Sequence, residues 1–236
     1  MTPYYSDDSV TIYHGDCRDV APTIAPASID LLLTDPPYGM AFVSGWAANK
    51  QPVKSDGVRQ GIRVVRSALN ELHHTFGSEM HALIFCHWES WPDFYDNLCH
   101  LFQIRNALIW HKRGGGMGDL RHEYAKDFEV ILFGARGRGR ELAGKRAGAV
   151  ITGYNRVPAQ QREVPFQKPV PLLVELIDRH APTKGIILDP FTGSGSTLVA
   201  AKKAGRHSIG IELDERYCEI AARRLSQEVL DFGGAA

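Results

Sequence analysis

The segment of this chain best suited to chemistry joins an acid to two prolines and an aromatic ring, Asp35-Pro36-Pro37-Tyr38. Two consecutive prolines remove two amide donors and hold the backbone extended, so that carbonyl oxygens can face a ligand beside the Asp35 carboxylate. These acceptors suit a planar NH2 group, whose two protons would bond to Asp35 and to the Pro36 carbonyl. Tyr38 offers a flat face on which a base can stack. Asp before Pro also commonly begins a turn, so the segment alone leaves a purely structural role open.

A second candidate site is a glycine-rich loop between a predicted strand and a predicted helix. The strand ends at Asp189, the loop continues as Pro190-Phe191-Thr192-Gly193-Ser194-Gly195-Ser196, and the helix opens at Thr197. Glycines let a nucleoside ligand approach the backbone closely, and a helix N-terminus favours a negative group. Glu212, at the end of the next predicted strand, stands where Rossmann-like sites place an acid on ribose hydroxyls, with Asp214 as its nearest competitor. A plain strand-to-helix turn followed by a surface acid would explain the same residues.

Basic residues gather in the middle of the chain, although the formal net charge is zero. Between residues 105 and 146 bases outnumber acids, and glycine is frequent. Such bases either contact phosphates or form a solvated loop surface. The candidates for phosphate contact are Lys112, Arg113, Arg121, Arg136, Arg138 and Arg140.

The cysteines and histidines do not predict a metal site. The four cysteines are scattered without a CxxC pair, which fits reduced thiols better than disulfides or zinc ligands. Four histidines between residues 73 and 87 have a spacing that crosses a predicted helix and a predicted strand, so we expect no metal there. These residues are Cys17, Cys86, Cys99, Cys218, His73, His74, His81 and His87.

Seven short apolar runs rich in β-branched or aromatic residues predict strands. They are Val10–His14, Ile29–Thr34, His81–His87, Arg105–His111, Phe128–Gly134, Gly185–Asp189 and His207–Leu213. Most are nearly continuous in hydrophobic residues, as in parallel strands covered on both faces, and helical patterns follow at 197–204 and 214–230. The predicted class is therefore α/β. The long irregular stretch from 134 to about 165 is typical of a functional or disordered loop.

A chain of 236 residues can form one compact domain without disulfides or metal. No stretch approaches the roughly 20 apolar residues of a membrane span, and residues 1–10 carry acids where a signal peptide would have an apolar core. We therefore expect a single-domain cytoplasmic protein without membrane association.

Taken together, these motifs resemble those of the DNA amino-methyltransferases, which methylate adenine N6 or cytosine N4. The family's catalytic tetrapeptide is matched by 35–38, its cofactor loop by 189–195, and the motif that precedes this loop by 166–169. His14-Gly15-Asp16 resembles the element that closes over the adenine of the cofactor. The resemblance covers residues 10–40 and 164–225 well and the middle loosely. The catalytic motif precedes the cofactor motif, which is the circularly permuted β arrangement of the family.

The resemblance implies a Rossmann-like, seven-stranded, mostly parallel sheet with helices on both faces. The strand ending at Asp189 would be central, with the strands of Glu212 and then Asp16 on one side and that of Asp35 on the other. Ligands bind open α/β sheets where the strand order reverses, so Asp35 would lie beside Gly193. The implied cofactor is S-adenosylmethionine. The implied catalytic residues are Asp35, Pro36, Pro37 and Tyr38, and the implied cofactor-binding residues are Asp16, Cys17, Asp35, Lys168, Asp189, Phe191, Gly193, Ser194, Gly195, Ser196 and Glu212.

The function implied by the resemblance is site-specific methylation of the N6 amino group of a flipped-out adenine in double-stranded DNA. Cytosine-N4 methylation is the alternative, although that activity more often carries Ser where this chain has Asp35. Methylation of RNA or of a protein amide, where related motifs begin with Asn, and a non-catalytic DNA-binding module are the more distant alternatives.

The middle of the chain offers two inserted segments for DNA recognition, about 112–124 and 136–161. Many relatives carry a larger recognition region, so the length of the recognised sequence stays open. A cognate restriction endonuclease is a candidate partner, and both a monomer and a homodimer are compatible with the sequence.

Overall fold

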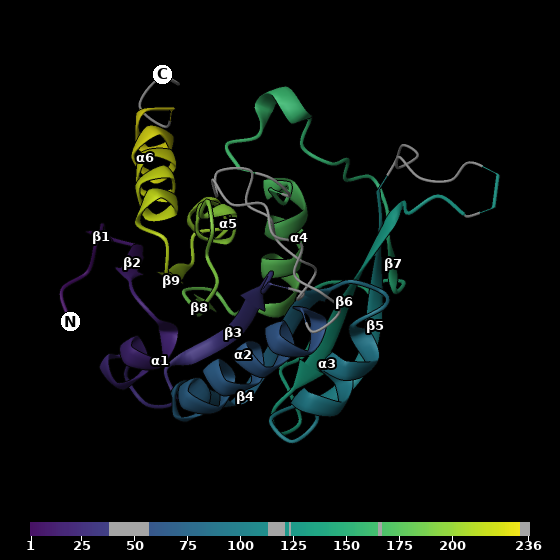
Figure 1. Cartoon of the computed structure of the whole chain (residues 1–236). Coiled ribbons are helices and arrows are strands. Elements are labelled where there is room, and N and C mark those ends of the chain that lie inside the picture. The colour runs from purple at the N-terminus through teal and green to yellow at the C-terminus, as the bar shows by residue number, and fades with distance from the viewer. Residues whose placement is uncertain (38–56, 113–120, 123, 165–166, 232–236) are drawn as a thin grey trace.

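The computed structural model describes residues 1–37, 57–112, 121–122, 124–164 and 167–231 (Figure 1). Tyr38, Arg113 and Phe166, which the sequence analysis singled out, lie outside the described residues. Those described form a nine-stranded sheet of order β1-β2-β9-β8-β3-β4-β6-β5-β7. The strands are β1 (Tyr5–Ser6), β2 (Val10–His14), β3 (Ile29–Thr34), β4 (Phe76–Cys86), β5 (Gln103–His111), β6 (Phe128–Ala135), β7 (Val150–Ile151), β8 (Ile186–Asp189) and β9 (His207–Glu212).

The predicted α/β class and mostly parallel sheet are confirmed. Strands β2, β9, β8, β3 and β4 each run parallel to the next, β6 runs antiparallel to both of its neighbours, and β8 lies between β9 and β3 as expected. Strands β1 and β7 were not predicted, because two residues each are too short to show a period. Strand β4 starts five residues before its predicted start, since Gly77, Ser78 and Glu79 interrupt the apolar pattern there.

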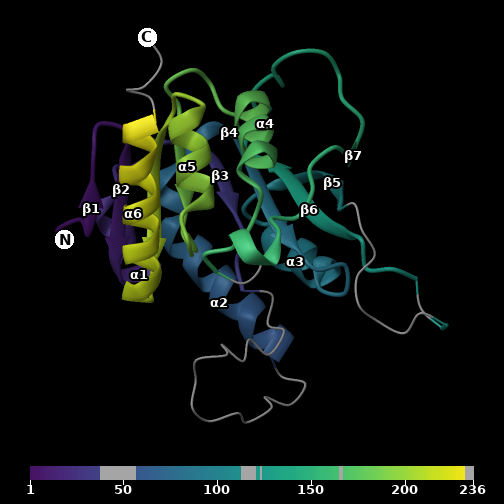
Figure 2. The same cartoon turned by 90° about the horizontal axis from the view of Figure 1, so that it is seen from above.

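Six α-helices in the described residues cover the sheet on both faces (Figures 1 and 2). They are α1 (Cys17–Val20), α2 (Gly57–Leu72), α3 (Trp91–Leu98), α4 (Val170–His180), α5 (Ser196–Lys203) and α6 (Glu215–Asp231). Leu32 of β3 packs in one core cluster with side chains of α1, α2 and α3, whereas its neighbours Leu31 and Leu33 pack in another with α4 and α5. Strand β3 is thus buried on both faces, which explains its continuous apolar sequence.

Two buried histidines join β4 to α4. His81 Nδ1 and His180 Nδ1 lie 3.2 Å apart, and both side chains are almost fully buried. Burial, with smaller contributions from His81 and Arg179, lowers the pKa of His180 to about 3, and burial also lowers the pKa of His81. The folded protein therefore holds this pair neutral at ordinary pH.

We predict that this pair makes the protein less stable as the pH falls below about 6.5. An unfolded histidine takes up a proton below that pH, whereas folded His180 does so only near pH 3, so stability present above pH 6.5 is lost as the pH falls toward 3. Urea unfolding of the wild type should show a slope of up to about 1.4 kcal/mol per pH unit for each such histidine. His180→Asn should flatten this slope between pH 6.5 and 5, and an unchanged slope would contradict the assignment.

Candidate active site

The acidic side chains that are candidates for catalysis or ligand binding lie at the carboxyl ends of the parallel strands. Asp35 follows β3, Asp189 ends β8, Glu212 ends β9, and Asp16 follows β2. The hydroxyl of Thr34 donates a 2.7 Å hydrogen bond to Asp189 Oδ1, joining the ends of β3 and β8. This edge, at the reversal of strand order, is where open α/β sheets bind ligands.

The loop after β8 is held by the buried carboxylate of Asp189. Besides Thr34, Asp189 Oδ1 accepts from the Phe191 amide at 3.2 Å. Burial raises the pKa of Asp189 to about 6, against hydrogen bonds from Thr197 and Thr34 that lower it. The carboxylate thus fixes the start of the loop from inside the protein.

The two glycines of the loop have different surroundings. Both adopt a left-handed backbone, with φ of 52° at Gly193 and 78° at Gly195. A Cβ added to Gly195 would lie 2.8 Å from the Cβ of Ala221 on α6, whereas a Cβ on Gly193 would meet no atom within 4 Å. Gly195 is therefore needed for packing, and Gly193 borders open space in which a ligand can approach the backbone.

Glu212 closes the other side of this loop. Its Oε2 accepts from the Gly193 amide at 2.7 Å and its Oε1 from the Asp214 amide at 2.9 Å. Burial raises the pKa of Glu212, and these amides oppose the rise. Each carboxylate oxygen can accept a second hydrogen bond, as a ribose hydroxyl would require. The competitor Asp214 instead pairs with Arg216 at the surface, so the geometry favours Glu212.

The predicted cofactor residues after β2 are engaged within the protein. Asp16 caps α1 by accepting from the Arg18 amide at 2.9 Å, and it pairs with the Arg18 guanidinium. Hydrogen bonds from Arg18 hold the pKa of Asp16 at about 2. Cys17 is buried, and burial raises the pKa of its thiol to about 11. A contact from Asp16 to the cofactor would therefore share a carboxylate that already binds Arg18.

The serine hydroxyls of the glycine loop face α6. Arg224 Nη1 lies 3.0 Å from Ser194 Oγ and 3.1 Å from Ser196 Oγ. Both serines are buried, while Phe191 is partly buried against the core. Arg224 Nη1 also donates to the Ser194 carbonyl at 2.5 Å, so the two serines hold the loop to α6.

Four charged side chains lie in a row at the end of β3. Lys168, just before α4, pairs with Asp35 and also approaches Glu129 Oε2 at 3.2 Å, and Lys112 Nζ binds Glu129 Oε1 at 2.9 Å. We call Asp35, Lys168, Glu129 and Lys112 the charge row. Desolvation, opposed by Lys168 and reinforced by Glu129, raises the pKa of Asp35 to about 6. Of the two prolines that follow, Pro36 is buried and Pro37 exposed.

Sequence reasoning missed Glu129. It stands in β6 between Phe128 and Val130, and the signal that could have revealed it is a lone charge in a strand that is otherwise apolar. Lys112 was predicted to contact DNA phosphates, but its side chain is only 9% exposed and pairs with Glu129. Its position supports a role inside the site rather than on the surface.

Three arginines predicted to bind DNA lie at the opposite edge of the sheet. Arg136 donates to the Phe76 carbonyl at the start of β4, and Arg140 binds Asp30 at the start of β3 at 2.5 Å. The Arg138 amide donates to Glu79, also near the start of β4. Because β6 runs antiparallel to β4, the chain after β6 emerges roughly 20 Å from Asp35, the length of one strand. The placement therefore argues against the prediction that these arginines serve the site.

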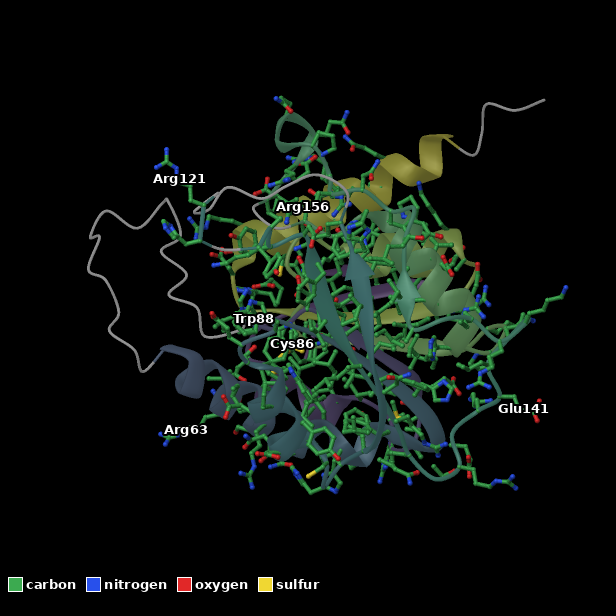
Figure 3. The ribbon with its side chains drawn as sticks, turned by 90° about the vertical axis from the view of Figure 1, so that its right-hand side faces the viewer. Arg63, Cys86, Trp88, Arg121, Glu141 and Arg156 are labelled. Carbon is green, nitrogen blue, oxygen red and sulfur yellow. The ribbon has the colours of Figure 1, made fainter. Side chains whose placement is uncertain are left out.

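The segment 136–161 is not one loop. Its first part lies against the C-terminal end of α4, where the Ala143 amide bonds to the Arg179 carbonyl. Strand β7 then pairs with β5, and the chain returns to the site edge, where Arg156 donates to the Lys126 carbonyl at 2.9 Å. Arg121 and Arg156 lie in the upper part of the view in Figure 3, and Glu141 lies at its lower right.

Two further features bear on the expectations from sequence. Within the part of the chain that the structure describes, no three His, Cys, Asp or Glu residues gather closely enough to hold a metal ion, and the four cysteines are free thiols. None of the described helices has the length and apolar character to cross a membrane.

Comparison with protein families matches residues 29–223 to the family described as DNA methylase. The YubD protein of Escherichia coli K12, named as a methylase, is 30% identical over 228 residues, covering 94% of this chain and 93% of that protein. YhdJ of Escherichia coli K12, named as a DNA adenine methyltransferase, is 26% identical over 259 residues, covering 94% of this chain and 84% of its own length.

Solved structures share the fold. The PvuII DNA methyltransferase, described as cytosine-N4-specific, superposes with a TM-score of 0.78 at 12% identity, covering 94% of this chain and 88% of that one. The complex of M1.HpyAVI with S-adenosylmethionine superposes with a TM-score of 0.68 at 22% identity, covering 91% and 99%. At these identities the likeness concerns the fold.

We predict that Gly193→Ala and Gly195→Ala separate ligand binding from stability. Both changes place alanine in a left-handed conformation, at about 1 kcal/mol each. Gly195→Ala also collides with Ala221 and should lower the melting temperature markedly more. Gly193→Ala should stay folded but lose affinity for S-adenosylmethionine, measured by calorimetry. If Gly193→Ala and the wild type bind S-adenosylmethionine with equal affinity, the ligand does not approach the backbone at Gly193.

Proposed function

The chain belongs to the DNA methylase family, whose methyl donor is S-adenosylmethionine, and from this premise we propose that it methylates the N6 amino group of adenine in double-stranded DNA. The observation that carries the proposal is the hydrogen bond from Thr34 to Asp189. Thr34 directly precedes Asp35, and Asp189 opens the glycine loop, so this bond holds the proposed catalytic acid beside the proposed cofactor loop.

The loop fits the cofactor in its shape and in its acceptors. Gly193 leaves room for a ligand against its backbone, and Glu212 keeps acceptor capacity for ribose hydroxyls. The opening of α5 directly after Gly195 favours the negative methionine carboxylate. We assign the binding of the cofactor chiefly to Gly193, to Glu212 and to the backbone around them.

Asp35 and Pro36 would prepare the target amine. An exocyclic amine conjugated to its ring is a poor nucleophile, and hydrogen bonds from its protons to Asp35 and to the Pro36 carbonyl shift electron density toward its lone pair. With a pKa of about 6, Asp35 is mostly ionised at pH 7 and can accept these bonds. S-adenosylmethionine would supply a methyl group from its sulfonium, whose sulfur–methyl bond would break to leave a neutral thioether, and the amine that takes up the methyl group would release one proton. Asp35 or nearby water accepts this proton.

The target base must leave the duplex to reach this site. Base flipping costs a few kcal/mol and gives access to atoms that stacking hides. Positioning of the two reactants then supplies most of the acceleration, about 7 to 11 kcal/mol for well-oriented groups. Tyr38 is assigned as the stacking partner on sequence grounds alone.

Adenine is favoured over cytosine by Asp35 itself. In the related enzymes cytosine-N4 methylation more often goes with Ser at this position, and the relative YhdJ is named as an adenine enzyme. The similarity to PvuII methyltransferase, described as cytosine-N4-specific, keeps cytosine as the second candidate, because the same acceptors would serve its N4 amine.

We also propose that the DNA lies against the edge of the sheet that holds the site. The described residues 121–122, 124–127 and 150–162 reach this edge and would form the recognition loops of a single catalytic domain. Arg121 and Lys126 are exposed there, and Arg156 bonds to the Lys126 carbonyl. These three residues replace Arg136, Arg138 and Arg140 as the proposed phosphate contacts.

Duplex DNA incubated with labelled S-adenosylmethionine should yield N6-methyladenine, detected by mass spectrometry of the nucleosides. Asp35→Ala should lower this activity by about 100-fold or more, as the loss of a preorganised polar contact does, while S-adenosylmethionine still binds. Glu212→Ala is the matched control, expected to weaken cofactor affinity. Label in N4-methylcytosine would move the target to cytosine, and label only in RNA or protein would refute DNA as the substrate.

Replacement of Arg121, Lys126 and Arg156 with Ala should weaken DNA binding and lower its salt dependence. Each lost phosphate contact reduces the slope of log K against log salt by about 0.9. The matched control removes the same charge at the opposite edge, with Arg138, Lys145 and Arg146 changed to Ala. If the salt dependence falls in the control but not in the first variant, the DNA binds at the opposite edge of the sheet.

A further inference from the structure

We propose that Glu129 and Lys112 are positioning residues that control how strongly Lys168 is committed to Asp35, and that they thereby set the charge and the availability of the Asp35 carboxylate. The inference rests on the proposed role of Asp35 as the acceptor for the target amine. It assigns a function to two largely buried residues, whose side chains are 9% exposed in Lys112 and 19% in Glu129.

The geometry makes Lys168 a shared cation. Its ammonium contacts Asp35 on one side and Glu129 Oε2 at 3.2 Å on the other, and its side chain is only 6% exposed. Glu129 in turn is shared, because its other oxygen binds Lys112 at 2.9 Å. The charges alternate along the row from Asp35 to Lys112 and sum to zero. Asp35 and Glu129 therefore compete for the ammonium of Lys168, and Lys168 and Lys112 compete for the carboxylate of Glu129.

Three separate elements converge to build this row. Lys112 follows the last residue of β5, Glu129 belongs to β6, and Lys168 stands before α4. The Lys168 ammonium also lies 5.0 Å from the ring of Phe85 on β4. Removal of such charges from water is unfavourable, and in proteins apolar side chains of similar size often stabilise the fold as well or better. Perturbed charges of this kind collect at functional sites, which favours a role in the chemistry.

Because Lys168 is shared with Glu129, an oxygen of Asp35 stays able to accept a hydrogen bond from the target amine. A lysine with no second partner would bind the Asp35 carboxylate fully and occupy the oxygen needed by the amine. Glu129 draws Lys168 partly away, and Lys112 limits this effect by holding Glu129. Burial tends to lower the pKa of Lys168, but Asp35 and Glu129 outweigh burial and raise it, so this lysine stays charged. The pKa of Glu129 is lowered, because Lys168 and Lys112 outweigh its burial.

Other titratable groups near Asp35 lie on or next to neighbouring strands. Asp189 of β8 and Cys86 of β4 both interact with its charge, and His87 after β4 is close enough to sense Glu129 and Lys112. The pKa of the Cys86 thiol is raised to about 12, mainly by burial, so it stays neutral. Over the acid range, the charges that act on Asp35 are therefore chiefly Lys168, Glu129 and Lys112, in that order.

Opposite shifts of the pH profile test the proposal. Ionised Asp35 is the active form, so activity should fall as the pH drops through its pKa. Glu129→Gln removes a negative charge that raises this pKa, and the acid limb of kcat/KM should move to lower pH. Lys112→Gln removes a positive charge that lowers it, and the limb should move to higher pH. The double variant should return close to the wild-type limb.

Glu129→Gln should also lower kcat at pH 7, because Lys168 then commits to Asp35. Glu71→Gln is the matched control, since Glu71 is an exposed acid near the end of α2, just before β4 begins at the opposite edge of the sheet. This control should leave both kcat and the limb unchanged. If one variant is misfolded, as a lowered melting temperature would show, the direction in which the acid limb of kcat/KM moves in the other variant still tests the proposal.

A titration of the Asp35 carboxyl by carbon NMR, assigned with Asp35→Asn, measures the same shifts without any DNA. Opposite displacements in the two single variants would support the inference. Equal displacements, or none, would overturn it even in an enzyme that methylates DNA. A protein that methylates no DNA but shows the opposite shifts would refute the proposed function and leave the control of Asp35 standing.

Discussion

The buried carboxylate of Asp189 is the constraint on which the rest of the site depends. It lies at the end of the central strand β8, is only 2% exposed, and accepts from both Thr34 and the Phe191 amide. A buried carboxylate without such donors would be strongly unfavourable, so these bonds fix the backbone that supplies them. One acid therefore holds two segments, 155 residues apart in the chain, in a single arrangement. Asp35, the proposed acceptor for the target amine, lies beside the loop of Gly193 because the residues next to each of them bind this same carboxylate.

The sequence predicted those parts of the fold that burial dictates. Strands β2 and β3 have the bounds that their apolar runs indicate, because a strand covered on both faces admits few polar residues. The order of the central strands followed from the resemblance, and it places Asp35 and Glu212 at the same edge. Local pattern could not reveal the direction of β6. The position of Arg136, Arg138 and Arg140 at the edge away from Asp35 follows from that direction, which is a property of the pairing with β4.

The charge row shows a second limit of reasoning from sequence. Glu129 and Lys112 carry ordinary charged side chains, and only the convergence of β5, β6 and the start of α4 makes them part of the site. Lys112 looked like a surface base because it stands beside Arg113 and a run of glycines. Its neighbour across the sheet, Glu129, draws it inward, and such pairing between strands is visible only once their register is known.

The basic residues make different contacts at the two edges of the sheet, one formed by the amino ends and the other by the carboxyl ends of the parallel strands. At the edge where β3 and β4 begin, Arg136 donates to backbone carbonyls and Arg140 to Asp30, which itself accepts from the Ile186 amide of β8. These bonds tie strand ends together, and a phosphate would have to displace them. At the opposite edge the lysines of the charge row bind carboxylates of the site, and the loops of Arg121 and Arg156 extend beyond them. The basic residues in the middle of the chain therefore have two different roles. Some hold strand ends together at one edge of the sheet, and others lie at the edge that carries the site. A count of charges along the sequence cannot separate the two groups.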